Sequence, residues 1–371
     1  MIVTNPCTND ARVLKEATTL SKYGYDVVIL AIMGNNTIKL EHTDSFIIKR
    51  MKRRFKSNTL LGKLEFTFKF TIVSITEKAS IYHAHDLSTL FECYIASRIN
   101  KSKIVYDSHE LSINSYGKKK FGEFLYYILE KLLIKKMNRV ITVNKFIAKE
   151  LRNRYDLINN PMVVMNCPPL ELCDDKMKSV SADIRNLKFS GKKVILYQGG
   201  FQEGRGLRQL IETFKYLSDE YSLLMVGDGP LRDDLERAVR KMHLNYKIFF
   251  TGMVSLNELS EYSKVADLGV ILFENNCMNN YYASPNKLFE YIHASIPVLA
   301  PDYPFFREII EKYDVGVLIN KIESKTIANK IKNILNNIEK YNILKNNTQR
   351  AKKELNWEVE EKKFINIYKN L

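Results

Sequence analysis

Runs of apolar, often β-branched residues alternate along the whole chain with amphipathic stretches of helical periodicity. Most of these runs lack the in–out alternation of a strand that has one face in water. Strands that are apolar on both sides are typical of a parallel sheet covered by helices on both faces. Strand–helix alternation of this kind predicts the α/β class with doubly wound sheets.

The predicted strands fall into two sets. In the first half of the chain they are MIVTN, DVVILAIM, SIYHAH, KIVYD, RVITV and MVVM. In the second half they are KVILYQ, YSLLMV, KIFFT, DLGVIL, IPVLA and VGVLI. A polar, charged segment that opens with two prolines separates the sets, at residues 166–193. The pattern therefore predicts two Rossmann-like domains with a linker between them.

We place the N-terminal domain at 1–170, the linker at 171–192 and the C-terminal domain at 193–352. Residues 353–371 read as a last helix, which we expect to pack back toward the N-terminal domain. Ligands of doubly wound sheets bind outside the carboxyl ends of the strands. We therefore expect the site in a cleft between two facing domains.

Composition narrows the class of protein. The chain has 371 residues, 45% of them hydrophobic, and a formal net charge of +15. The charge indicates an anionic partner or a genome rich in lysine. Five cysteines without a CxxC pair indicate neither a zinc site nor a disulfide framework and fit a cytoplasmic setting. We expect no membrane-spanning helix and no secretory signal.

The segment SPNKLFEY, residues 284–291, has the pattern of a helix start that binds phosphate. Ser284 suits the N-cap and Pro285 the first helical position. The free N–H groups and the dipole of a helix start favour an anion. An anion there would also offset the unfavourable position of Lys287, a cation in the first turn beside Asn286. Glu290, about 4.5 Å further along the axis, can accept hydrogen bonds from a ribose. The alternative is a capped surface helix with a Lys–Glu pair.

Glycine-rich turns follow three strands of the second half. The first is GGFQEGRG, residues 199–206, in which Arg205 can bind phosphate oxygens through its planar guanidinium. A loop so rich in glycine can approach a phosphate closely, or it is a tight turn with a solvated arginine. The candidate glycines are Gly199, Gly200, Gly227, Gly229 and Gly252.

Five of these motifs occur in a specific order: VILYQGGFQEGRG, LLMVGDGP, FFTGMV, SPNKLFEYIHASIPVLA and REIIEKYDVGVLI. Together they resemble the C-terminal domain of retaining GT-B glycosyltransferases of family four. The resemblance implies a GT-B fold and a nucleotide-sugar donor. It also implies that Arg205 and the helix start contact the diphosphate and that Glu290 contacts the ribose. Lys287 lies in the same helix turn, and we group it with Arg205 as a residue of the transfer step.

Two positions depart from the family pattern. Many members carry a second glutamate eight residues before the ribose glutamate, where this chain has Tyr282. Many also carry an arginine five residues before the basic loop residue, where this chain has Gly200. Both changes remove contacts expected to the sugar or the phosphates.

The first half supplies histidines and carboxylates at strand ends. IYHAHDLSTL carries His83 and His85 on one face of a strand, and no third metal ligand is near in sequence, so we expect no metal site. The resemblance implies that His85 contacts the donor sugar near the reacting centre. KIVYDSHELS follows with Asp107 and a histidine–glutamate pair. The acceptor-side candidates are Asp10, Arg12, His109 and Glu110.

Arg12 has two interpretations. A cation in the first turn of a helix is unfavourable, because the helix dipole opposes it. Either an anionic ligand lies near Arg12 and offsets this cost, or Arg12 pairs with Glu16 one turn along the helix. The sequence leaves both open.

Two segments combine basic and apolar residues: 49–68 and 116–136. Such segments suit an anionic membrane surface, here the inner leaflet, or are solvated faces over a core stripe. No nucleic-acid-binding fold is recognisable, which argues against nucleic acid as the partner.

The predicted function is transfer of a hexose, with retention, from a nucleotide-sugar to a glycan or lipid-linked acceptor. The setting would be cell-surface polysaccharide, lipopolysaccharide or glycolipid synthesis, with no cofactor and no metal requirement. Two alternatives stay open on the sequence. One is a nucleotide-sugar epimerase of the same fold, and the other is a non-catalytic GT-B scaffold subunit.

Overall fold

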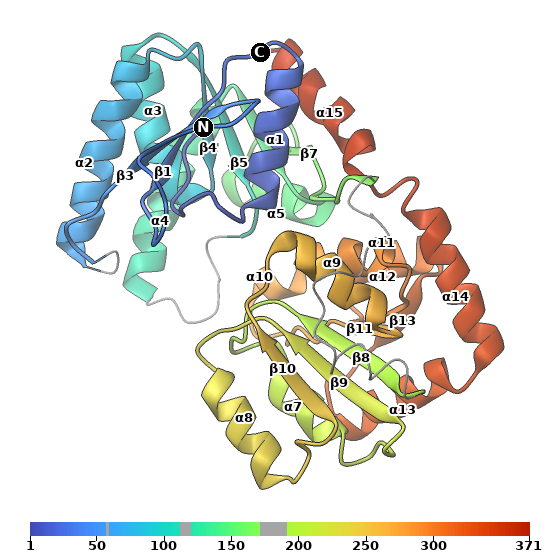
Figure 1. The fold of residues 1–371 in the computed structure, drawn as a ribbon. Helices are drawn as coiled ribbons and strands as arrows, with labels where there is room; N and C mark the ends of the chain where they lie inside the picture. The colour runs from blue at the N-terminus through green and yellow to red at the C-terminus, as the bar shows by residue number, and fades with distance from the viewer. Residues whose placement is uncertain (57–58, 112–119, 171–190) are drawn as a thin grey trace. The chain divides into compact units, whose positions relative to one another are not determined.

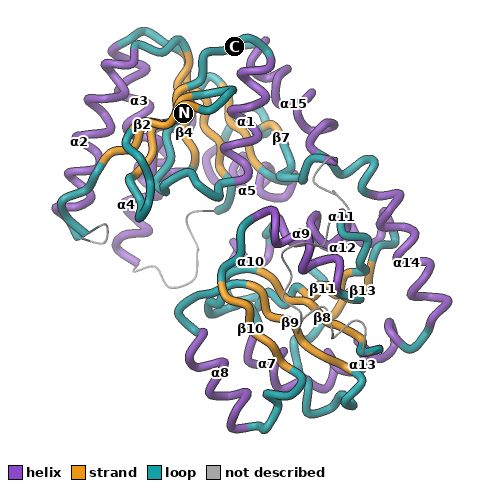
Figure 2. The backbone as a smooth tube through the Cα atoms, viewed as in Figure 1, coloured by secondary structure: helices purple, strands orange, loops and turns teal. Residues whose placement is uncertain are grey.

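The computed structural model describes residues 1–56, 59–111, 120–170 and 191–371 (Figure 1). These residues form two compact units, one of Met1–Asn166 with Glu360–Leu371 and the other of Cys167–Val359. The end of the chain thus belongs to the same unit as its beginning. The predicted linker, 171–192, lies almost wholly outside the described residues. Figure 2 shows helices alternating with strands in both units.

Unit 1 contains two hydrogen-bonded groups of strands, in the orders β1-β3-β2 and β4-β5-β6-β7. Only β2 is antiparallel to its neighbour. The predicted strand MIVTN is reduced to a bridge, because Ile2 alone pairs with Leu30 of β1 and Ala84 of β4. The strands are β1 (Val28–Ile32), β2 (Leu40–His42), β3 (Ile47–Met51), β4 (Ile81–His85), β5 (Lys103–Ser108), β6 (Arg139–Thr142) and β7 (Met162–Val163).

Helices connect these strands, as the periodicity predicts. The carboxylate of Asp10 caps the first of them by accepting the Val13 N–H at 3.3 Å. The helices are α1 (Ala11–Lys22), α2 (Leu60–Glu77), α3 (Leu90–Ile99), α4 (Lys120–Leu133), α5 (Lys145–Tyr155) and most of α15 (Trp357–Lys369). Two short 3₁₀ turns cover η1 (Leu87–Thr89) and η2 (Ile134–Lys136).

Unit 2 is built on one six-stranded sheet in the order β10-β9-β8-β11-β12-β13, and every pairing in it is parallel. In chain order this is 3-2-1-4-5-6, so the direction of winding reverses between β8 and β11. The strands are β8 (Lys193–Gln198), β9 (Tyr221–Val226), β10 (Ile248–Gly252), β11 (Leu268–Val270), β12 (Val298–Pro301) and β13 (Gly316–Ile319).

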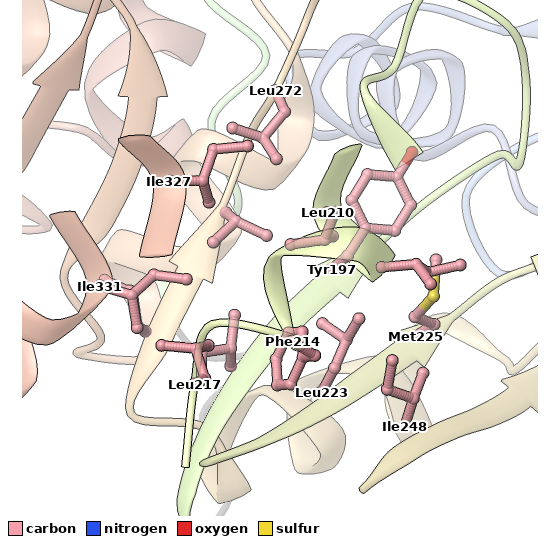
Figure 3. Close-up of a cluster of buried hydrophobic side chains, with 14 of the residues drawn as sticks. Tyr197, Leu210, Phe214, Leu217, Leu223, Met225, Ile248, Leu272, Ile327 and Ile331 are labelled. Atoms are coloured by element: carbon pink, nitrogen blue, oxygen red, sulfur yellow. The ribbon is translucent and has the colours of Figure 1, made fainter. Parts of the chain in front are cut away.

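The helices of unit 2 are α7 (Leu207–Thr213), α8 (Arg232–Lys241), α9 (Leu256–Val265), α10 (Met278–Tyr281), α11 (Asn286–His293), α12 (Pro304–Tyr313), α13 (Ser324–Leu335) and α14 (Ile338–Ala351). Side chains from α7 and α13 meet those of the strands in an apolar cluster (Figure 3). Its buried members include Phe214, Leu223 and Met225. Burying each such side chain contributes about 1.5–3 kcal/mol to the stability of the fold. The packed cluster thereby holds in place the strands whose ends carry the site.

Candidate active site

The site of unit 2 lies where the sheet changes direction of winding. The loop after β8 begins with Gly199, and the chain leaving β11 reaches Phe273. Ligands of open α/β sheets bind outside the carboxyl ends of the strands at such a point. The fold itself therefore selects this region.

Two cations meet here over aromatic rings. The Arg205 guanidinium carbon lies 4.0 Å from the ring centre of Phe273. The Lys287 ammonium nitrogen lies 4.0 Å from the ring centre of Tyr197 and 5.8 Å from that of Phe273. Within the described part of the chain, no carboxylate forms an ion pair with either cation. Two neighbouring cations that form no ion pair among the described residues indicate an anion-binding site, although the Glu290 carboxylate one turn along α11 also favours the charged form of Lys287.

Lys287 is the more deeply placed of the two, with 9% of its surface exposed. Burial, with the nearby positive charge of Arg205, lowers its pKa from the usual 10.5 to about 7. An anionic ligand would favour the charged form and raise this pKa. The ammonium group is thus poised to respond to the charge of a ligand.

Glycines make the room that this arrangement needs. A Cβ on Gly199 would lie 3.1 Å from the Lys287 ammonium nitrogen, on a backbone whose φ is +123°. A Cβ on Gly227 would lie 2.1 Å from the Gly199 carbonyl oxygen, which is too close for any residue other than glycine. The Gly227 N–H also donates to the Gly252 carbonyl at 3.0 Å. Three of the predicted glycines therefore lie together at the ends of β8, β9 and β10.

The other two predicted glycines line the same edge. The Gly200 carbonyl accepts a hydrogen bond from the Tyr197 hydroxyl at 2.9 Å. The backbone of Gly229 packs against Phe201, where a Cβ would lie 2.6 Å from the Phe201 carbonyl oxygen. Both positions therefore hold the loop after β8 in place.

One detail of the predicted helix start is wrong. Helix α11 begins at Asn286, and its N-cap is Pro285, not Ser284. The reason is that Pro285 has an extended backbone, with ψ at 140°, so the helix starts one residue later. The Ser284 hydroxyl is buried and has no hydrogen-bond partner among the described residues, and Asn286 is exposed. An unpaired hydroxyl beside the first N–H groups of a helix adds a donor to the anion site.

Glu290 lies on α11 beyond Lys287 and is held by a residue that the sequence reasoning missed. The Gln198 side-chain amide donates to the Glu290 carboxylate, and its oxygen accepts from the Ser263 hydroxyl at 3.0 Å. Gln198 therefore fixes the direction of the carboxylate. A polar residue ending the apolar strand KVILYQ was the available signal.

The predicted residues of unit 1 form a second, buried group. The Arg12 guanidinium donates to both oxygens of Asp107, at 2.7 and 2.9 Å, and lies 3.0 Å from Glu16. The Arg12–Glu16 pair foreseen on the helix therefore exists, and Asp107 joins it. The charge of Arg12 is neutralised inside the protein, and all three side chains are buried.

His85 belongs to the same group. Its ring stacks on that of His83 at 4.2 Å, and its Nδ1 lies 3.3 Å from Nε2 of His109. His109 also contacts Asp107 at 3.1 Å. Two predicted residues lie outside the group: Asp10, which caps α1, and Glu110, whose side chain is exposed.

Four donor atoms of this group, from Glu16, His83, His85 and Asp107, lie within 4.8 Å of one another. The sequence around His83 and His85 shows no third ligand, because Glu16 belongs to α1 and Asp107 to β5. The Arg12 guanidinium already lies against both carboxylates. A metal ion there would have to displace that cation, so we assign none.

Unit 1 also has an open pocket of about 500 Å³ at the carboxyl ends of β1 and β3. Lys52 and Arg53 line it, and the Arg53 Nε is buried without a hydrogen-bond partner among the described residues. The pocket lining is Thr4, Ile32, Met33, Gly34, Asn35, Lys52 and Arg53. Its cations suit an anionic group.

Comparison with known proteins identifies the class to which this architecture belongs. Residues 11–168 match the family model Glycosyltransferase Family 4, and residues 181–351 match Glycosyl transferases group 1. The chain belongs to this glycosyltransferase family. An uncharacterised glycosyltransferase of Methanocaldococcus jannaschii is 22% identical over 95% of this chain and 92% of its own.

Solved structures agree on the fold. Sucrose-phosphate synthase from Thermosynechococcus elongatus matches with a TM-score of 0.82 at 17% identity, covering 100% of this chain and 97% of its own. Anabaena HepE, solved in complex with UDP-glucose, matches with a TM-score of 0.75 at 16% identity, covering 100% and 98%. The protein is a glycosyltransferase of the GT-B type, with two α/β domains.

Proposed function

We propose that the protein transfers a hexose from a nucleotide-sugar to a glycan or lipid-linked acceptor, with retention at the anomeric carbon. The observation that carries the proposal is the meeting of Arg205 and Lys287, without a carboxylate partner in the described chain, at the start of α11 and one turn from Glu290. The two cations and the helix N–H groups bind the diphosphate. The Glu290 carboxylate accepts the hydrogen bonds of the ribose hydroxyls.

The reaction needs stabilisation of a leaving group more than a strong nucleophile. The bond from the anomeric carbon to the diphosphate oxygen breaks, and the bond to the acceptor oxygen forms on the same face. The acceptor's proton passes to the departing phosphate, whose charge the two cations stabilise. Tyr282 stands where a second carboxylate would be needed for a covalent route, so we favour this front-face course.

The donor is proposed to be a UDP- or GDP-hexose, used without a metal ion. HepE was solved with UDP-glucose, which supports a uridine donor as the first to try. Arg205 and Lys287 supply the positive charge that a divalent cation gives in metal-dependent sites. Membership of this glycosyltransferase family fits a metal-free donor site. Unit 1 fits it too, because the Arg12 guanidinium already lies against the carboxylates of Glu16 and Asp107.

The function is tested by thermal shift and donor turnover. UDP-glucose, UDP-galactose, UDP-N-acetylglucosamine and GDP-mannose are each added to the purified protein, with and without EDTA. We expect one or more to raise Tm and to be slowly hydrolysed, equally in EDTA. The proposal fails if no nucleotide-sugar raises Tm or is consumed, and its metal-free part fails if EDTA abolishes turnover.

The pKa of Lys287 makes donor binding dependent on pH. The diphosphate raises this pKa in the complex, so affinity is full below pH 7 and falls as pH rises through about 7. The fall is at most tenfold per pH unit and ends at the pKa of the complex. Calorimetry with UDP-glucose between pH 6 and 8 measures it, because neither the diphosphate nor the uracil of this donor titrates in that range.

Lys287→Met is the matched variant, since it keeps the apolar stem and removes the titrating group. Its affinity should be weak at every pH and lack the fall above pH 7. A wild-type profile as flat as that of Lys287→Met would show that Lys287 does not face the diphosphate.

The acceptor is proposed to be presented at an anionic membrane surface, on the cytoplasmic side. Helix α2 leaves a stripe of apolar side chains exposed, and α4 leaves another. The two helices are neighbours, since the Lys63 ammonium nitrogen of α2 lies 6.0 Å from the ring centre of Tyr126 on α4. Exposed on α2 are Leu60, Leu61, Leu64, Phe68 and Ile72, and exposed on α4 are Phe124, Leu125, Ile128 and Leu132. Among the described helices, none is long and apolar enough to cross a bilayer.

Charge surrounds this apolar surface. Arg54 and Lys63 are exposed, and Lys52 and Arg53 line the pocket at the end of β3, just before α2. Apolar side chains beside cations bind anionic lipid by insertion and attraction together. In the synthesis of cell-surface polysaccharide or glycolipid, the pocket lined by Lys52 and Arg53 would bind an anionic part of the acceptor.

Vesicle sedimentation tests this surface. The double variant Leu64→Ser/Phe68→Ser should bind vesicles of phosphatidylglycerol and phosphatidylcholine at least tenfold more weakly than the wild type, because two inserted side chains are lost. The control is Ile338→Ser on α14, where the side chain is 68% exposed but lies in unit 2. Wild-type protein that stays in the supernatant at low salt, or equal losses in both variants, would contradict the proposal.

A further inference from the structure

We infer that His109 is an imidazolium at neutral pH that holds His85 in its Nε2–H tautomer, so that His85 serves the transfer step as a hydrogen-bond donor and not as a base. The inference deepens the proposed function and takes its catalytic meaning from it. His109 and Asp86 are then positioning residues, and the ligand atom that His85 meets is an oxygen.

The surroundings of His109 require both of its nitrogens to carry protons. Its Nδ1 lies 3.3 Å from a carboxylate oxygen of Asp86, and its Nε2 lies 3.1 Å from a carboxylate oxygen of Asp107. In a neutral ring one nitrogen would turn its lone pair toward a carboxylate, which is repulsive at these distances. Burial opposes the charge, yet the two carboxylates outweigh it and raise the pKa of His109 well above its ordinary value.

The proton on His109 then decides the tautomer of His85. The His109 Nε2–H, which faces Asp107, also lies 3.3 Å from Nδ1 of His85. Two N–H groups facing each other at this distance would repel, so Nδ1 of His85 must be the acceptor. The His85 proton is therefore on Nε2. That atom is buried and has no hydrogen-bond partner among the described residues.

His85 itself stays neutral. Burial, with the neighbouring rings of His83 and His109, lowers its pKa well below the ordinary value. An uncharged ring with a free Nε2–H is a hydrogen-bond donor, and the described part of the chain offers it no acceptor. A sugar or phosphate oxygen supplies that acceptor, and a ring that already carries its proton on this nitrogen cannot serve as a base there.

The groups around this pair come from four elements of unit 1. Helix α1 contributes Arg12 and Glu16, β4 contributes His83, β5 contributes Asp107, and α15 contributes Tyr368, whose hydroxyl lies 2.6 Å from Nδ1 of His83. Arg12, with His109, holds the pKa of Asp107 well below its usual range, although burial opposes this. Burial raises the pKa of Glu16, so its carboxyl favours the protonated form.

The backbone at Asp86 shows that its position is imposed. Its φ is +64° and its ψ is 166°, a region that non-glycine residues rarely occupy. Its carboxylate also accepts the His109 N–H of the backbone at 3.0 Å. The strained residue is thus fixed against His109 at both the ring and the main chain.

Nitrogen NMR tests the inference without any assay of activity. The full chain is labelled with ¹⁵N-histidine, and long-range ¹H–¹⁵N spectra distinguish the imidazolium from the two neutral tautomers. His85→Gln and His109→Gln assign two of the six histidines. We expect His109 doubly protonated and His85 in the Nε2–H form from pH 6 to 8. A neutral His109 at pH 7, or His85 in the Nδ1–H form, overturns the inference.

Asp86→Asn supplies the activity arm, because it keeps the shape of the side chain and removes the charge. His109 should then lose its proton at lower pH, and the alkaline fall of kcat should move down by at least one pH unit. The control is Asp26→Asn, an exposed carboxylate of the same unit. An unmoved pH profile in Asp86→Asn counts against the inference. Failure of all nucleotide-sugars to bind would overturn the proposed function but leave the NMR result standing.

Discussion

Replacing Arg205 with alanine is expected to lower kcat for sugar transfer by about 10²–10³-fold, because one preorganised cation is removed from the charge that develops on the leaving diphosphate. The protein should stay folded. Arg205 forms no ion pair within the described chain, and its stacking on Phe273 at 4.0 Å accounts for about 0.5–1 kcal/mol of stability. Steady-state kinetics with saturating donor, together with Tm, separates the two effects.

The chain offers a close control for this variant. Arg208 lies three residues along the same segment, is 51% exposed and pairs with Glu203 and Asp234. Arg208→Ala should transfer sugar at a rate close to that of the wild type. Arg205→Lys should recover part of the activity, since it restores charge without the planar guanidinium. Wild-type turnover in Arg205→Ala would remove Arg205 from the site.

Replacing Glu290 with alanine is the second large effect. Each charge-assisted hydrogen bond to a ribose hydroxyl contributes about 1.5–3 kcal/mol, so kcat/KM should fall by at least about 10²-fold. The loss should appear mainly in donor affinity, because the ribose contact is made before the transition state as well as in it. Calorimetry with UDP-glucose and transfer kinetics measure the two parts.

Glu290→Gln refines the test. It keeps the size of the side chain, and its amide oxygen can still accept from the Gln198 amide, which leaves an NH2 group in place of an accepting oxygen toward the ribose hydroxyls. Its affinity should therefore lie close to that of Glu290→Ala. Glu311→Gln, on the exposed side of α12, is the control and should be unaffected. Donor binding by Glu290→Ala that equals the wild type would refute the ribose assignment.

The sequence predicts the architecture of unit 2 well, because its signals are local. Apolar strands, glycine turns and the pattern of α11 each depend on neighbours in the chain. Gly199 and Gly227 lie at strand ends and Arg205 lies in the loop after β8, where the pattern placed them. The start of α11 was one residue off, since proline fixes φ but leaves ψ free to be extended at Pro285.

Residues brought together by tertiary contact were harder to foresee. Phe273 and Tyr197 hold the two cations, but aromatic residues in apolar runs are indistinguishable from core. Asp107 reaches Arg12 from 95 residues away in the sequence, so neither the ion pair nor its effect on His85 shows in a local pattern. The basic segment 49–68 was expected as one surface feature, yet it begins in β3 and continues in α2.

The most direct test of the central claim is a crystal structure of the protein with bound UDP. We predict that the diphosphate lies at the start of α11 within hydrogen-bond distance of Arg205 and Lys287, and that the ribose hydroxyls contact Glu290. A nucleotide bound elsewhere on the chain, with these three side chains untouched, would contradict the account.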